Sequence, residues 1–238
     1  MSAQNNAILV APSILSGDFG NLAAAAKLAE DSGADALHVD IMDGHFVPNL
    51  TLGPKALMAI NKATNLFLDV HLMMYNPYDY IERFVEAGAD RITFHFEATE
   101  DVGDTLAFIR RCNIEAGLAF CPDTSLSLIP KYLNQCDLVL LMTVNPGFGG
   151  QAFLPEVLDK IRFTRDLCTK LRLCKGGVTL KDEENDSLLP PFAIQVDGGI
   201  TQETGKLCVD AGANILVSGN YLYVAKDMKQ AIRDFKNL

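Results

Sequence analysis

The chain of 238 residues is long enough for one substantial hydrophobic core, and 49% hydrophobic residues exclude intrinsic disorder and fit buried parallel strands. The formal net charge of −10 argues against nucleic acid as a partner, and it means that an anionic substrate must be captured locally. No apolar run is long enough to cross a bilayer, and no basic region precedes an apolar stretch at the N-terminus, so we expect a cytoplasmic protein with no membrane partner.

Short apolar runs predict eight β-strands, and an amphipathic stretch follows each of them. The expected strands are Ile8–Ala11, Ala36–Ile41, Phe67–Leu72, Arg91–Phe96, Ala116–Phe120, Leu138–Thr143, Phe192–Val196 and Ile215–Ser218. The expected helices are Leu22–Asp31, Pro54–Lys62, Pro77–Ala87, Gly103–Arg111, Leu126–Leu133, Pro155–Leu171, Gln202–Asp210 and Lys226–Phe235. Eight strand–helix pairs at this spacing predict an α/β fold, a single-domain (β/α)8 TIM barrel over residues 1–238. An open doubly wound sheet is the alternative, but the first helix lacks the opening G-x-G-x-x-G pattern.

The stretch 173–191 interrupts this alternation because it is polar and charged and ends in two prolines. It precedes the seventh strand, so it belongs to the N-terminal face of the barrel, where few functional residues lie. We therefore expect an exposed insertion of small functional weight.

Imidazole and carboxylate side chains alternate near the ends of the second and third strands. Because alternate strand residues share a face, His38 and Asp40 point into one interior space, and so do Asp69 and His71. Asp197 ends the seventh strand. Two imidazoles and two carboxylates suit a divalent transition metal, and the carboxyl ends of barrel strands face the active site. The pattern thus predicts a metal site of His38, Asp40, His71 and Asp197, with Asp69 one layer deeper as support for a ligating imidazole.

Two alternatives stay open at this point. His95 and Glu97 on the fourth strand have the same spacing as the expected ligands, and spacing alone does not exclude them. Methionines 42, 73 and 142 lie just past the ligands at three strand ends. Met42, Met73 and Met142 either fill space or form a polarisable, water-poor cap over a reacting group.

Glycine-rich turns follow the last three strands. They contain Gly147, Phe148, Gly149 and Gly150, then Gly198 and Gly199, and finally Gly219 with Asn220. Glycines let backbone amides approach an anion closely, and turns after strands seven and eight are the frequent phosphate site of this fold. Because these turns contain no Lys or Arg, we expect backbone N–H groups to bind the phosphate.

Specific motifs recur in order along the chain. They are Ser13-Ile14-Leu15, the stretch from His38 to Asn49, His71-Leu72-Met73, Met142-Thr143-Val144 with Pro146–Gln151, and Asp197-Gly198-Gly199-Ile200. Together they resemble the ribulose-phosphate 3-epimerase family. The resemblance implies a barrel of the ribulose-phosphate-binding type and an isomerase of the pentose phosphate pathway, which interconverts D-ribulose 5-phosphate and D-xylulose 5-phosphate.

The resemblance also implies roles for individual residues. One divalent metal ion per subunit (zinc, iron, manganese or cobalt) would bind to His38, Asp40, His71 and Asp197. Asp40 would accept a proton and Asp197 would donate one, through an enediolate. Ser13 and His71 would contact the sugar, and the glycine turns and Asn220 would hold the phosphate.

The sequence departs from the family pattern at two positions. Cys121 stands before Pro122, where a polar residue is usual, and Asn220 stands where serine is usual. The first substitution removes a polar contact to substrate if the position faces it, whereas the second leaves the backbone amides available.

Three alternative functions remain. A metal-dependent phosphoesterase, a catalytically silent sugar-phosphate binding protein and an epimerase for a related hexulose phosphate would share these motifs. A decarboxylase is disfavoured because no D-x-K-x-x-D pattern is present. The expected partner is a small sugar phosphate, with self-association into a homo-oligomer left open.

Overall fold

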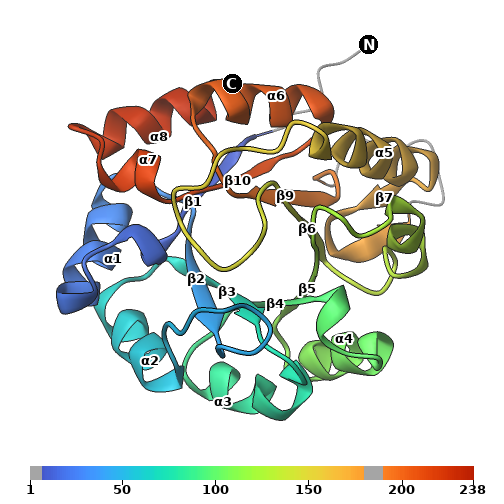
Figure 1. Cartoon of the computed structure of the whole chain (residues 1–238), viewed down its shortest axis with the longest axis horizontal. Coiled ribbons are helices and arrows are strands. Elements are labelled where there is room, and N and C mark those ends of the chain that lie inside the picture. The colour runs from blue at the N-terminus through green and yellow to red at the C-terminus, as the bar shows by residue number, and fades with distance from the viewer. Residues whose placement is uncertain (1–6, 180–189) are drawn as a thin grey trace.

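The computed structural model, which describes residues 7–179 and 190–238, contains a barrel of eight parallel strands surrounded by helices (Figure 1). The barrel strands are β1 (Leu9–Pro12), β2 (Ala36–Met42), β3 (Phe67–Met73), β4 (Arg91–His95), β5 (Glu115–Phe120), β6 (Leu138–Met142), β9 (Ala193–Asp197) and β10 (Ile215–Ser218). Their order around the sheet is β1-β10-β9-β6-β5-β4-β3-β2. The predicted (β/α)8 barrel is confirmed.

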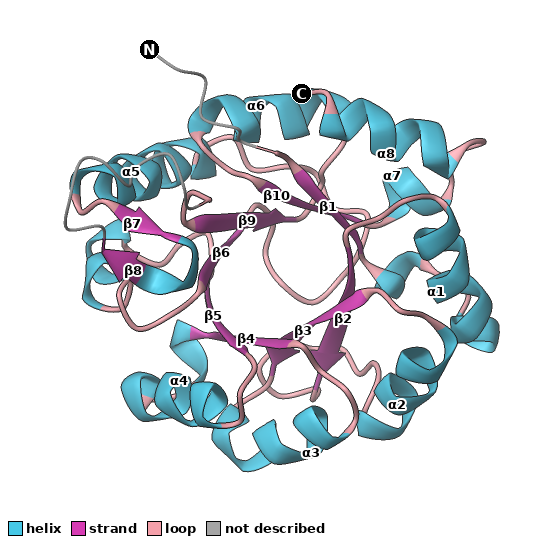
Figure 2. Ribbon diagram, turned by 180° about the vertical axis from the view of Figure 1, so that it is seen from behind, coloured by secondary structure: helices cyan, strands magenta, loops and turns pink. Residues whose placement is uncertain are grey.

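The α-helices form a ring outside the strands, as Figure 2 shows from the opposite side. They are α1 (Leu22–Asp31), α2 (Pro54–Ala63), α3 (Ile81–Glu86), α4 (Val102–Arg111), α5 (Val157–Lys170), α6 (Gln202–Ala211), α7 (Asn220–Tyr223) and α8 (Met228–Lys236). Short 3-10 helices lie at η1 (Ile14–Ser16), η2 (Phe19–Asn21), η3 (Pro77–Tyr80), η4 (Phe96–Ala98), η5 (Leu126–Lys131) and η6 (Lys175–Gly177).

The helices differ from the sequence prediction at several places. The expected helix Pro77–Ala87 begins as the 3-10 helix η3 and continues as α3. The expected α-helix over Leu126–Leu133 is the 3-10 helix η5, because Pro130 inside it lacks the N–H that an α-helix needs. The four-residue helix α7 was not predicted, since Asn220–Tyr223 is too short to show a hydrophobic period.

Local signals in the sequence define the ends of α6. The Thr201 hydroxyl accepts a hydrogen bond from the Thr204 backbone N–H, and the Thr204 hydroxyl accepts one from the Thr201 backbone N–H. This capping box begins the helix by satisfying two N–H groups that otherwise lack partners. Gly212 then ends it with a left-handed conformation (φ +113°) that leads into β10. The N-terminus of α6 is thereby held next to the end of β9, where Asp197 lies.

Apolar side chains fill two regions. The larger core lies between the strands and the helices, with Leu37, Val39 and Val70 fully buried. Inside the barrel, Leu138 and Leu140 pack with neighbouring strands. Because both faces of each strand are covered, β-strands such as Leu138–Met142 are continuous apolar runs.

Strands β1 and β2 are joined more loosely than any other neighbours. Among the described residues, no ladder connects them. An isolated bridge pairs Ser13 with His38, and Asp35, just before β2, bonds Val10 twice, from its backbone N to Val10 O at 3.0 Å and from Val10 N to its Oδ2 at 2.8 Å. The barrel is therefore nearly closed, with a seam that runs past Ser13.

The predicted insertion over 173–191 is described only in part, because residues 180–189 lie outside the described ranges. Its first residues form β7 (Leu173–Cys174) and β8 (Val178–Thr179), an antiparallel pair after α5. None of the helices within 7–179 and 190–238 is long and apolar enough to cross a membrane.

Candidate active site

The register of β2 and β3 determines which polar side chains meet. The ladder pairs His38 with Asp69, Asp40 with His71 and Met42 with Met73. Alternate residues of one strand share a face, so these pairs lie in successive layers along the inside of the barrel. The structure thus stacks the predicted imidazoles, carboxylates and methionines on a single face.

The four predicted metal ligands converge at the mouth of the barrel. Each of His38, Asp40, His71 and Asp197 offers one ligand atom, and these atoms all lie within 4.8 Å of one another. His38 Nε2 is 3.3 Å from Asp40 Oδ1 and 3.8 Å from Asp197 Oδ2. His71 Nδ1 is 3.0 Å from Asp40 Oδ1. Two nitrogens and two oxygens therefore surround one point, a donor set that fits a divalent transition metal.

A buried polar layer beneath the cluster orients His38. Its Nδ1 lies 2.8 Å from Asp69 Oδ2, so Nδ1 donates to Asp69 and Nε2 faces the cluster. Asp69 is in turn held by Gln195 Nε2 at 2.6 Å and Arg91 Nη1 at 3.3 Å. Asp69 thus has the supporting position expected from the sequence. Gln195 was missed, although its place two residues before Asp197 puts it on the same strand face.

The two carboxylates of the cluster titrate in opposite directions. Burial opposes the charge of Asp40, but the His38 imidazole and hydrogen bonds from His38 and His71 outweigh burial and hold its pKa well below the ordinary value. Burial, then the nearby charge of Asp40, raises the pKa of Asp197 to about 7. In the metal-free chain, Asp40 is therefore ionised at neutral pH, whereas Asp197 is about half protonated.

The pKa values of the two imidazoles are also shifted in opposite directions. Burial lowers the pKa of His71 to about 4 despite its hydrogen bond to Asp40. Burial also opposes the charge of His38, but Asp40 and Asp69 together outweigh burial and raise its pKa well above the ordinary value. His71 is therefore neutral at physiological pH, and His38 carries the positive charge of the cluster.

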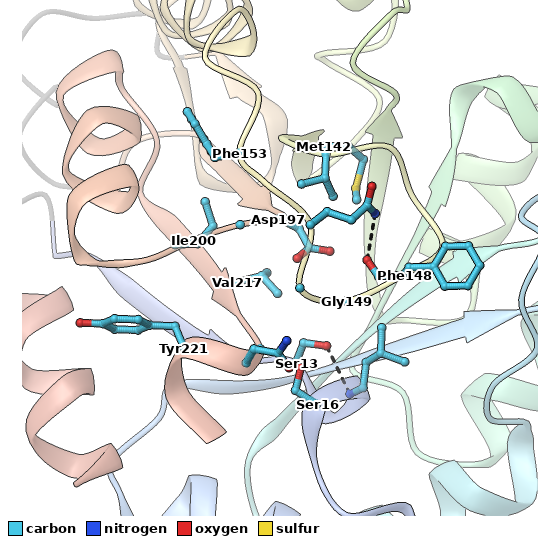
Figure 3. A pocket seen from close by; sticks show the side chains of 18 of the residues that line it. Ser13, Ser16, Met142, Phe148, Gly149, Phe153, Asp197, Ile200, Val217 and Tyr221 are labelled. Carbon is cyan, nitrogen blue, oxygen red and sulfur yellow. Dashed lines mark hydrogen bonds between the residues drawn. The ribbon is translucent and has the colours of Figure 1, made fainter. Parts of the chain in front are cut away.

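A cavity of about 590 Å³ opens over the cluster and is large enough for a small phosphorylated sugar. The three methionines line it with Asp40 and Asp197, whereas His38 and His71 are fully buried beneath. In Figure 3 the Asp197 carboxylate lies between Met142 and Ser13. Ser13 Oγ donates to Asp40 Oδ2 at 2.6 Å, which orients that carboxylate.

The predicted phosphate turns line the other end of the same cavity. They contribute Gly147, Phe148, Gly149, Gly150, Gly198, Gly199, Gly219 and Asn220, together with Ser16, which sequence reasoning did not identify. The loop between β6 and α5 runs across the mouth of the barrel (Figure 1). Among the described residues that line the cavity there is no Lys or Arg, so backbone N–H groups are the donors available to an anion.

Close packing explains why these turns need glycine. Gly198 has φ +118°, and a β-carbon there would lie 2.4 Å from Val144 Cγ2. Gly199 has φ +63°, and its β-carbon would lie 2.8 Å from the backbone N of Phe153. An L side chain at either position is therefore excluded both by backbone conformation and by space.

The competing pair His95 and Glu97 lies beside the cluster. With Cys121 it forms a second group whose potential ligand atoms lie within 4.8 Å of one another. His95 Nε2 lies 2.9 Å from His71 Nε2, on the side of His71 that faces away from Asp40. None of the three residues lines the cavity, so the change to cysteine at position 121 removes no group that faces it.

Most of the chain matches known proteins. The model of the ribulose-phosphate 3 epimerase family matches residues 9–223. A ribulose-phosphate 3-epimerase of Chlamydia pneumoniae is 49% identical over 225 residues, with 94% of this chain and 92% of that protein covered. One from Bacillus subtilis is 43% identical, with 96% and 98% covered.

Among solved structures, a phosphoribosyl anthranilate isomerase from Thermus thermophilus has a similar barrel. The TM-score is 0.63 at 17% identity, with 97% of each chain covered. A likeness at this identity supports the fold alone. The family match and the curated relatives together go further, and they show that the chain belongs to the ribulose-phosphate 3-epimerase family, a family of enzymes.

Proposed function

We propose that the chain is a metal-dependent epimerase that interconverts D-ribulose 5-phosphate and D-xylulose 5-phosphate through an enediolate, as a step of the pentose phosphate pathway. The observation that carries this proposal is the pair Asp40 and Asp197, two carboxylates that line one cavity from two separate strands. Membership of the epimerase family supports it.

The placement of the two carboxylates suits inversion of a carbon centre. Asp40 lies two residues before the end of β2 and Asp197 ends β9, and β1 and β10 separate these strands around the barrel. Epimerisation next to a ketone requires removal of a proton from one face of the carbon and delivery of a proton to the other face. Asp40 accepts the proton at one face of the carbon, and Asp197 delivers a proton at the other face. In the reverse direction the roles are exchanged.

The cluster fits one divalent ion, whether zinc, iron, manganese or cobalt, held by His38, Asp40, His71 and Asp197. The negative charge of Asp40 disfavours a second charge on Asp197, and a bound dication would offset this repulsion between the two carboxylates. A bound metal ion supplies Lewis acidity toward the ketone oxygen, which stabilises the enediolate by several kcal/mol. Ser13 fixes the Asp40 carboxylate and contacts the sugar, and His71 lies 3.0 Å from the other oxygen of Asp40.

The remaining predicted residues bind and shield the substrate. The glycine turns after β6, β9 and β10, with Asn220, bind the phosphate through backbone N–H groups. Met42 and Met73 pack with Val47 at one side of the cavity, and Met142 packs on the inner apolar cluster. These side chains keep water away from the enediolate.

The test is incorporation of solvent deuterium into ribulose 5-phosphate, followed by NMR. We expect exchange by the metal-loaded protein, loss of exchange with a chelator, and recovery when metal is returned. Asp40→Asn and Asp197→Asn should each abolish exchange, because an amide neither accepts nor delivers the proton. Glu203→Gln is the matched control, since Glu203 lines the cavity outside the cluster.

Several outcomes contradict the proposal. Normal exchange in Asp40→Asn or Asp197→Asn with metal content confirmed refutes the two-carboxylate mechanism. Release of inorganic phosphate identifies a phosphoesterase instead. Substrate binding without exchange in the unmodified protein identifies a silent binding protein, and faster exchange on a hexulose phosphate identifies a different epimerase.

A further inference from the structure

We propose that His95 and Glu97 position the metal ligand His71 through a chain of hydrogen bonds, in which Glu97 holds His95 and His95 holds His71. This inference rests on the metal site proposed above. It assigns both residues as positioning residues, since neither lines the cavity.

The first link is the contact between the two imidazoles. His71 Nδ1 faces the cluster, 3.0 Å from Asp40 Oδ1 and 3.4 Å from His38 Nε2. Its Nε2 therefore points the other way, to His95 Nε2 at 2.9 Å. A metal needs the lone pair of Nδ1, so a neutral His71 must carry its proton on Nε2. His95 Nε2 must then accept that proton's hydrogen bond.

The second link follows from the first. A neutral His95 that accepts at Nε2 carries its own proton on Nδ1. That nitrogen lies 3.2 Å from Glu97 Oε2, which accepts. The other oxygen of Glu97 accepts from the Cys121 backbone N–H at 2.9 Å and from the Thr124 hydroxyl. One consistent set of protons satisfies every group from Thr124 to His71.

The surroundings keep His95 in this orientation. Its side chain is fully buried, with the Phe46 ring centroid 4.7 Å away and the His71 ring centroid 5.0 Å away. The second imidazole ligand has a shorter version of the same arrangement, because Asp69 holds His38 directly at 2.8 Å. Each proposed imidazole ligand is thus hydrogen-bonded to a carboxylate on the side away from the metal site. His38 contacts Asp69 directly, and His71 is linked to Glu97 through His95.

The same contacts argue against a separate metal at His95, Glu97 and Cys121. Nδ1 is the nitrogen of His95 that faces both Glu97 Oε2 and Cys121 Sγ, at 3.2 and 3.5 Å. A metal bound to Nδ1 would move the proton of His95 to Nε2. Two N–H groups would then face each other at 2.9 Å once His71 binds its own metal. The two uses of His95 therefore exclude each other.

Cobalt affinity of the full chain tests the proposal without relying on activity. We would measure it by competition with a chelator, together with the visible spectrum of bound Co²⁺. His95→Leu removes the acceptor for His71, and we expect about 10- to 100-fold weaker binding and an altered spectrum. His95→Gln offers an amide oxygen near the position of Nε2, and it should restore most of the affinity and the original spectrum.

Two further variants separate the links. Glu97→Gln should weaken cobalt binding less than His95→Leu, because the amide oxygen still accepts from His95 without the charge. Cys121→Ala is the matched control: it removes a side chain 3.5 Å from His95 Nδ1 but keeps the backbone N–H, so affinity and spectrum should not change. The bound cobalt should be one per chain in all variants.

Three results overturn the proposal. The first is a folded His95→Leu protein with normal affinity and spectrum. If that variant does not fold, unchanged cobalt affinity in Glu97→Ala overturns the proposal from the outer end of the chain. The second is two cobalt ions per chain, one of them lost in Cys121→Ala. The third is no cobalt binding by the unmodified protein, which refutes the metal site itself. Loss of cobalt in His71→Ala together with normal cobalt affinity in His95→Leu supports the metal site and refutes only the hydrogen-bond chain.

Discussion

Metal affinity should rise steeply with pH, because protons compete with the ion for its ligands. Asp197 has a pKa of about 7, owing first to burial and then to the charge of Asp40, and it must be ionised to bind metal. The pKa of His38 is also raised, so its Nε2 must lose a proton as well. His71 has a pKa of about 4 and is already neutral, so it releases none above pH 5.

The size of the effect follows from the number of protons released. The folded-state pKa of Asp197 is raised, so its protonated form dominates below about pH 7 and each metal ion displaces one proton there. One displaced proton changes the apparent affinity about tenfold per pH unit. Between pH 5.5 and 7, Asp197 alone accounts for about 16-fold, or about 1.7 kcal/mol, because half of it is already ionised at pH 7. His38 adds a second displaced proton. The logarithm of the apparent metal affinity should therefore rise by between one and two per pH unit below pH 7, and by about one per pH unit above it.

Calorimetric titration of the metal-free protein with Zn²⁺ measures this release directly. Repeating the titration in buffers with different ionisation enthalpies gives the number of protons released at each pH. Asp197→Asn should release about one proton fewer than the unmodified protein at pH 6 and the same number at pH 8.5. Equal release by the two proteins at pH 6 would refute the assignment of the raised pKa to a metal ligand.

Three further predictions concern stability. In the metal-free protein, the pKa of Asp197 is raised in the folded state, so the folded chain binds more protons than the unfolded chain between about pH 4 and 7. The free energy of unfolding should therefore fall as pH rises through that range. Asp197→Asn should flatten the pH profile of the urea midpoints. Gly198→Ala should lower the free energy of unfolding in urea by about 2–4 kcal/mol, because its β-carbon would lie 2.4 Å from Val144 and its φ is +118°. Gly53→Ala is the control, since nothing lies within 4 Å of its β-carbon, and it should cost under about 1 kcal/mol. Equal losses in the two variants would contradict this reasoning. Asp69→Leu should cost about 3–5 kcal/mol, since it removes the partner of a buried guanidinium and a buried imidazole, and a thermal midpoint close to that of the unmodified protein would show that these groups find other partners.

The convergence of the four ligands was predictable because strand geometry determines it. Alternation within β2 and β3 puts His38, Asp40 and His71 on the inner face, whatever their exact register. The carboxyl end of β9 brings Asp197 to the same mouth. A barrel prediction from eight strand–helix pairs was therefore enough to place this cluster.

The supporting contacts were not predictable from one sequence. Gln195 reaches Asp69 from a strand 126 residues away, and that contact depends on the closure of the barrel. The position of His95 beside His71 depends on the lateral register of β3 and β4, which pairs His71 with Thr93 and which no local pattern encodes. By spacing alone, His95 and Glu97 were as good candidates for metal ligands as His38 and Asp40. Only the packed structure shows that His95 and Glu97 lie outside the cluster that faces the cavity.

The hydrogen bond between Ser13 and Asp40 crosses the seam between β1 and β2, so it has a structural role as well. A parallel sheet that ends at two free edges usually needs a cover over those edges. Here the hydroxyl of Ser13 crosses from one edge to the carboxylate of Asp40 on the other, at the place where backbone pairing is sparse. Active sites commonly cost a protein stability, so that inactivating substitutions make it more stable. At this seam, by contrast, a hydrogen bond of the candidate active site also contributes to closing the barrel. A substitution at Asp40 would therefore remove a contact across the seam together with a member of the cluster.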